Sequence, residues 1–127
     1  MSDSEKYRIK VTAVAEYGPG QSAPEEDRYV FAYHITITNI GSIGAQLLSR
    51  HWIITDGSGK VQEVRGQGVI GEQPVLAPGE QFSYSSGSVL ETAVGTMQGS
   101  YQMVAADGHR FDVEIPLFML AMPRVLH

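Results

Sequence analysis

Three glycines in the middle of the chain have the spacing of a nucleotide-binding loop. Gly66, Gly68 and Gly71 match the pattern G-x-G-x-x-G, and Arg65 precedes them. In a dinucleotide-binding domain such glycines form a tight turn, and backbone amides then approach a pyrophosphate at the start of a helix. Here Pro74 follows closely and opposes that helix. Two interpretations are left: an anion-binding nest of loop amides beside Arg65, or glycines that serve only a turn.

Residues that could carry catalysis or hold a metal are scattered along the chain. The sequence has no cysteine, which excludes thiolate chemistry and thiolate metal sites. No two histidines stand at zinc-ligand spacing among His34, His51, His109 and His127. The acidic run at 25–27 lacks calcium-loop spacing and is typical of a solvated loop. We therefore expect no enzyme activity, no metal site and no cofactor. Sequence spacing does not exclude a metal or catalytic site that the fold assembles from residues distant in sequence.

Side chains suited to partner recognition lie on both sides of the motif. Arg50, His51 and Trp52 place a cation, a titratable ring and a large aromatic ring in succession. Arginine and tryptophan are frequent in interface hot spots. Glu72 and Gln73 add polar groups directly after the motif. We expect these five residues to bind a protein partner, whose identity the sequence does not give.

Composition and charge restrict the class of partner further. The 127 residues fit one domain, expected over 1–127 with a core from about 7 to 120. Nine basic and fourteen acidic residues give a net charge of −5, whereas nucleic-acid binders are usually basic. The first residues lack a basic leader, and the longest apolar stretch, Ile115 to Pro123, is too short to span a membrane. We expect a cytoplasmic protein without membrane or nucleic-acid contact, and leave its oligomeric state open.

Alternation of apolar and polar residues predicts short strands. Between Tyr7 and Tyr17 every odd-numbered residue is apolar and most even-numbered residues are polar. This period is expected where one face of a strand is buried. Similar patterns predict seven strands, at 7–17, 28–38, 47–56, 60–65, 81–85, 101–105 and 110–115.

The segments between the strands carry turn signals. The pairs Asp56-Gly57 and Asp107-Gly108 predict hairpin turns with positive φ angles. The segment 90–97 predicts an irregular turn, since Gly95 interrupts its helical spacing. The apolar tail after Pro116 is expected to pack back on the sheet. The connection 66–79 is long for a compact domain, and such loops are often functional.

Seven short antiparallel strands in roughly 100 residues are typical of an immunoglobulin-like β-sandwich. The sequence lacks the two cysteines of antibody domains, so the fibronectin type III-like branch is favoured. A closed β-barrel is the main competitor. The predicted fold is therefore an all-β antiparallel sandwich.

An ordered series of motifs resembles the ApaG family. It covers nearly the whole chain, from about Tyr7 to Leu120. Its members are Arg50–Asp56 (RHWIITD), Val64–Pro74 (VRGQGVIGEQP), Leu76–Glu80 (LAPGE), Phe82–Gly87 (FSYSSG), Gly95–Met103 (GTMQGSYQM) and Phe111–Pro116 (FDVEIP).

The resemblance implies a fibronectin type III-like sandwich and a link to cobalt resistance and magnesium efflux. It also implies a protein-interaction role, since similar domains are attached to eukaryotic F-box proteins and to a DNA polymerase δ-interacting protein. The bacterial gene often neighbours that of a diadenosine tetraphosphate hydrolase. Three hypotheses follow: a protein-interaction module, a phosphate or nucleotide sensor using Gly66 to Gly71, and a factor in divalent-cation homeostasis.

Overall fold

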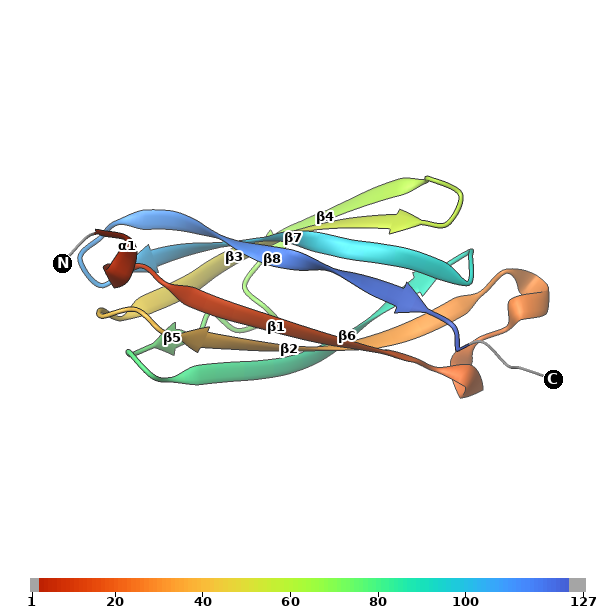
Figure 1. The fold of residues 1–127 in the computed structure, drawn as a ribbon, viewed down its shortest axis with the longest axis horizontal. Coiled ribbons are helices and arrows are strands. Elements are labelled where there is room, and N and C mark those ends of the chain that lie inside the picture. Colours follow the sequence, from red (N-terminus) through yellow and green to blue (C-terminus); the bar gives the residue numbers. More distant parts are fainter. Residues whose placement is uncertain (1–2, 124–127) are drawn as a thin grey trace.

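Strands make up most of the computed structural model, which describes residues 3–123 (Figure 1). The helical elements of this range are single turns: α1 (Asp3–Lys6), η1 (Pro19–Gln21) and η2 (Pro24–Glu26). The strands are β1 (Ile9–Tyr17), β2 (Tyr29–Asn39), β3 (Ala45–Asp56), β4 (Val61–Gln67), β5 (Val75–Leu76), β6 (Gln81–Leu90), β7 (Val94–Ala105) and β8 (Arg110–Ala121).

The strands form two antiparallel sheets, which confirms the predicted sandwich. One sheet has the order β1-β2-β6 and the other has the order β4-β3-β7-β8. The short strand β5 pairs with the beginning of β3, on the side of β3 that β4 also occupies. The edge of the five-stranded sheet therefore consists of β4, the segment that follows it, and β5.

Alternation along the strands places the core between the sheets. In β2, Phe31, Tyr33, Ile35 and Ile37 are buried, while His34 between them is exposed. Trp52 of β3 is 3% exposed. Its ring centroid lies 5.5 Å from that of Tyr33 and 6.0 Å from that of Phe118. Aromatic side chains thus join the two sheets, as is usual where inner faces interdigitate.

The irregular turn predicted in 90–97 is confined to a bend at 91–93, because β6 ends at Leu90 and β7 already begins at Val94. Its glycines allow close strand pairing. A Cβ on Gly95 would lie 2.7 Å from the Thr55 carbonyl oxygen, and one on Gly99 would lie 2.0 Å from that of His51. A glycine in a strand pattern can thus mark a close backbone approach.

Two other strands are longer than predicted. β6 continues to Leu90, and β8 continues through Pro116 to Ala121. The tail therefore extends the sheet as a strand instead of packing back on it. The pairing register of β8 with β7 shifts between Met97 and Gly99, which leaves Pro116 in an irregularity. A proline is tolerated there because a bulge residue needs no ladder hydrogen bond.

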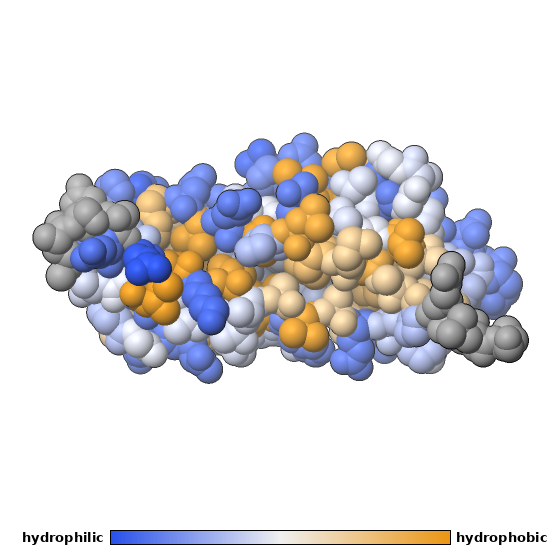
Figure 2. All heavy atoms as spheres, in the orientation of Figure 1, coloured by the Kyte–Doolittle hydropathy of each residue, from blue (hydrophilic) through white to orange (hydrophobic). Residues whose placement is uncertain are grey.

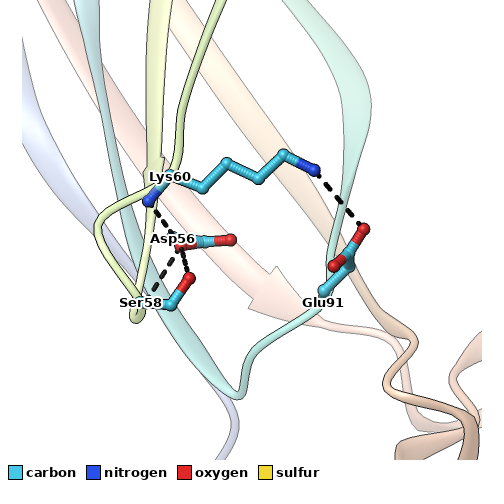
Figure 3. Close-up of polar contacts among 4 residues, drawn as sticks. All are labelled: Asp56, Ser58, Lys60 and Glu91. Atoms are coloured by element: carbon cyan, nitrogen blue, oxygen red, sulfur yellow. Dashed lines mark hydrogen bonds and ion pairs between the residues drawn. The ribbon is translucent and has the colours of Figure 1, made fainter.

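The turn after β3 is held by one carboxylate (Figure 3). Asp56 Oδ1 accepts hydrogen bonds from the Ser58 amide at 2.9 Å, the Ser58 hydroxyl at 2.7 Å and the Lys60 amide at 3.0 Å. These hydrogen bonds, that of the Ser58 hydroxyl foremost, lower the pKa of Asp56. The predicted turn is confirmed, but its positive φ falls on Gly59 and not on Gly57. Lys60 Nζ also lies 3.6 Å from Glu91 Oε1.

Hydrophobic side chains gather where β1 and β8 lie side by side (Figure 2). The large hydrophobic residues exposed on these strands are Val14, Leu117 and Met119, at 63%, 53% and 58% exposure. We call these three residues the β1–β8 band. Among residues 3–123, no helix is long and apolar enough to cross a membrane.

Candidate functional site

The glycine motif lies at one edge of the five-stranded sheet, in the segment that connects β4 to β5. Both of these strands pair with β3. Gln67 at the end of β4 pairs with Ser49, and Val75 at the start of β5 pairs with Gln46. We call residues 65–74 the glycine loop. Because both of its ends are fixed to one strand, the loop has a defined position on the sheet edge.

The motif itself forms a two-residue hairpin turn. The Val69 amide donates to the Glu72 carbonyl at 2.8 Å, and the Glu72 amide donates back at 2.9 Å. The enclosed residues, Ile70 and Gly71, have φ angles of +44° and +78°. Two positive φ angles are the signature of the type I′ turn. Gly68 also has a positive φ, and a Cβ there would lie 2.2 Å from the Glu72 carbonyl oxygen.

Three of the loop amides that could bind an anion already donate to the protein. The Gly68 amide donates to the Leu48 carbonyl at 2.8 Å. The amides of Val69 and Glu72 close the turn. Among residues 69–71 of the motif, the amides of Ile70 and Gly71 have no acceptor in the described part of the chain. This turn stands where a dinucleotide-binding domain would begin a helix. Gly68 and Gly71 supply the positive φ angles that the turn and its approach need.

The two arginines at the loop differ in their surroundings. Arg50 extends across Gly66, where a Cβ would lie 2.8 Å from Arg50 Nη1. Arg50 Nη1 donates to the carbonyls of Gln67 and Gly68, at 2.9 Å each. Arg65 is exposed and has no hydrogen bond or ion pair within residues 3–123. Arg50 therefore fixes the loop, whereas Arg65 is available to a partner.

The other predicted partner residues also separate into two groups. Trp52 lies in the core, so it cannot contact a partner, and this part of the prediction is corrected. His51 is on the outer face of the sheet, where its Nε2 lies 2.8 Å from Glu63 Oε1. Glu72 and Gln73 are exposed on the loop. The Gln73 side chain also donates to the Leu48 carbonyl at 2.9 Å and so braces the loop.

The outer face beside the loop is a shallow polar hollow. His51 and Arg65 are register partners across β3 and β4. The hollow is lined by these two and by polar side chains of β3, β7 and β8, among them Ser49, Ser100, Gln102 and Asp112. The Ser49 hydroxyl donates to Gln102 Oε1 at 2.8 Å. The Gln102 side-chain amide donates in turn to the Ser100 hydroxyl at 2.9 Å, so these hydrogen bonds hold Ser49, Ser100 and Gln102 side by side in the hollow.

A row on the other sheet brings together a serine, a histidine and a carboxylate. Ser85 Oγ lies 2.6 Å from His34 Nδ1, and Glu16 Oε2 lies 3.5 Å from His34 Nε2. The row lies on exposed positions of three paired strands, of which β6 is the edge strand of its sheet. An acyl-transfer site also needs donors aimed at an oxyanion, and the contacts of the row join its three side chains only to one another. The row links three strands. Across residues 3–123, no three His, Asp or Glu side chains are grouped as metal ligands.

Sequence reasoning missed the residue that the loop displays. Ile70 is 57% exposed at the tip of the turn, next to Val69, which is fully buried. The signal was two apolar residues placed directly before Gly71, inside the segment 66–79 that was predicted to be a long connection. Because Val69 anchors the turn in the core, Ile70 at the tip of the turn is exposed.

Two packed antiparallel sheets define an all-β sandwich of the immunoglobulin-like class. The ApaG domain family matches residues 19–105. Protein ApaG of Aromatoleum aromaticum is 80% identical and Protein ApaG of Azoarcus sp. is 74% identical, each over 127 residues that cover 100% of both chains. The crystal structure of the ApaA protein from Bordetella pertussis has a TM-score of 0.93 and 55% identity, covering 95% of this chain and 98% of that chain. The chain belongs to the ApaG family.

Proposed function

We propose that the chain is a non-enzymatic protein-interaction module that binds its partner through the glycine loop and the adjoining edge of the sheet. One observation carries the proposal: the hydrogen bonds of the loop hold it in one shape while its exposed side chains make few contacts. Arg50 and Gln73 bond inward, to backbone carbonyls. Ile70 and Arg65 are exposed. A surface already held in its bound shape loses little entropy on association.

The edge of the sheet supports the same proposal. β4 pairs with β3 on one side and has no neighbour on the other side within the described chain. An unpaired edge offers backbone donors and acceptors to an added strand. The partner would therefore meet backbone groups of β4 and side chains of the loop together.

The proposal includes the link to cobalt resistance and magnesium efflux that the family resemblance implies. We propose that the chain acts on cation homeostasis through its protein partner. Calorimetric titration of the purified chain with Co²⁺ and with Mg²⁺ separates this route from direct binding. Saturable binding of either ion at micromolar concentration would contradict the indirect route.

Capture from a bacterial lysate tests the proposed surface. The immobilised chain, its Arg65→Glu variant and a Lys10→Glu control would be compared by mass spectrometry. Lys10 is exposed on β1, in the other sheet, and its variant makes the same change of charge. We expect Arg65→Glu to lose the captured protein and Lys10→Glu to retain it. Equal capture by all three would show that the partner binds elsewhere.

Phosphate binding is the alternative function. The amides of Ile70 and Gly71 and the guanidinium of Arg65 are its available donors. Titration with pyrophosphate, ATP and diadenosine tetraphosphate, followed by amide chemical shifts, tests it. Saturable shifts confined to 66–71 would favour a sensor, and their absence would favour the interaction module.

A further inference from the structure

Ile70 has a backbone conformation that its side chain disfavours. Its φ of +44° lies in the left-handed region. There a β-branched side chain crowds the backbone, and such a residue is a genuine outlier. Asparagine or glycine is the usual residue at this position of a type I′ turn. The turn would therefore form more readily with another residue at position 70.

Burial does not explain the isoleucine. Its side chain is 57% exposed, whereas that of Val69 is 0% exposed and anchors the turn in the core. The hydrogen bonds that close the turn use backbone atoms only. More than half of the Ile70 surface is thus left outside the core, and a residue held in such a strained conformation is a candidate for a functional role.

The loop holds this side chain in a fixed place. The Gly68 amide donates to the Leu48 carbonyl, and Arg50 Nη1 donates to the successive carbonyls of Gln67 and Gly68. The Leu47 amide donates to the Pro74 carbonyl at 3.0 Å. The tip is therefore supported before and after the turn. A rigid apolar group can enter a pocket with a small loss of entropy.

Polar residues flank the tip along the chain. Arg65 and Gln67 before Ile70, and Glu72 and Gln73 after it, are exposed. We take these four as the polar rim of an apolar centre, the arrangement of a protein-interface hot spot. Arg65 and Glu72 have opposite charges, so the rim favours a partner that offers both a carboxylate and a hydrogen-bonding or basic group.

We propose that Ile70 is the anchor of the partner interface and inserts into an apolar socket, the size of one aliphatic side chain, on a folded protein. The inference rests on the proposed function and names the kind of partner surface that this site fits. The residue is kept for binding at the expense of turn stability. Replacing it should therefore move stability and affinity in opposite directions.

Thermal unfolding and partner affinity test this opposition in three variants. Ile70→Asn relieves the strain, Ile70→Val keeps an aliphatic group, and Val14→Asn is the matched control at another exposed apolar position. We expect Ile70→Asn to raise the melting temperature by about 3–5 °C. Ile70→Val should leave it within about 2 °C.

An aliphatic diazirine amino acid at position 70, close to isoleucine in size, identifies the partner by photocrosslinking in bacterial cells. Calorimetry with the purified partner then gives the affinities. We expect Ile70→Asn to weaken binding at least tenfold, while Ile70→Val and Val14→Asn stay within threefold. The crosslinked protein should disappear when the photoreactive residue is moved to position 14.

Each contrary result has a distinct meaning. No crosslink at position 70, an unchanged affinity of Ile70→Asn, or a lower melting temperature of that variant would overturn the inference. If Arg65→Glu weakens binding and Ile70→Asn does not, the proposed surface holds and the anchor is wrong. If neither substitution weakens binding, the proposed surface and the anchor both fail.

Discussion

Replacing Arg50 or Arg65 with methionine should have very different effects on stability, although the two arginines flank the same loop. Arg50 Nη1 donates two hydrogen bonds of 2.9 Å to backbone carbonyls, and Arg65 donates none within the described chain. Methionine retains most of the aliphatic stem and removes the guanidinium. The comparison therefore isolates the two hydrogen bonds from the effect of losing a positive charge.

The structure sets the expected size of the effect. A hydrogen bond that involves a charged group contributes about 1.5–3 kcal/mol, and solvent access places these two toward the lower end. Arg50→Met should thus lower the free energy of unfolding by about 2–3 kcal/mol. For 127 residues, at about 2.1 cal/mol/K of unfolding entropy per residue, this lowers the melting temperature by about 7–11 °C. Arg65→Met should change the free energy by less than about 0.5 kcal/mol.

Calorimetry of both variants measures the two melting temperatures, and amide hydrogen exchange reports on the loop. We expect Gly68 to exchange faster in Arg50→Met, because the carbonyls that define the turn lose their donor. Equal melting temperatures of the two variants would refute the assignment of Arg50 as the residue that fixes the loop. A larger loss in Arg65→Met would reverse the assignment.

Three further perturbations test other parts of the structure. Gly68→Ala should be strongly destabilising in chemical denaturation, because its Cβ would lie 2.2 Å from a carbonyl oxygen. Gly71→Ala, with φ +78° and open space around its Cβ, should cost only about 1 kcal/mol; equal costs would contradict the geometry. Asn39 is 1% exposed and makes three hydrogen bonds of 2.9 Å, so Asn39→Ala should lower the unfolding free energy by about 3 kcal/mol. A change below about 1 kcal/mol would show that water replaces the amide. Burial raises the pKa of Tyr84 from 10.0 to about 12, so its contribution to stability is full below pH 10 and is lost as the pH rises through about 12. Tyrosinate absorbance during alkaline unfolding measures this, and ionisation of every tyrosine near pH 10 in the folded protein would contradict it.

The fold could be predicted from the sequence because alternation reports directly on burial. The apolar residues at odd positions from Phe31 to Ile37 all lie in the core, as predicted. The errors fell on glycines and a proline. Gly95 was interpreted as a break, yet it lies, like Gly99, where a neighbouring strand comes too close for a Cβ. Such an approach depends on strands distant in sequence and leaves no local signal.

The candidate site could be predicted only in outline. The motif indicated the correct loop, but residue type alone could not separate Arg50, which bonds inward, from Arg65, which is exposed. Trp52 was expected at a binding surface because tryptophan suits interfaces, but strand register places it in the core. Ile70 was missed as a surface residue, because its exposure follows from the turn that Val69 and Glu72 close, and the apolar pair before Gly71 does not show which of its two members is buried.

Amide chemical-shift mapping of the isotope-labelled chain with its purified partner tests the central claim most directly. The claim is that the glycine loop is a rigid protein-binding tip, with Arg65 and Ile70 in contact with the partner. We predict that the largest shifts lie within 65–74 and along β4, with little change in the β1–β8 band. Shifts concentrated on the β1–β8 band, with the loop unaffected, would contradict the account.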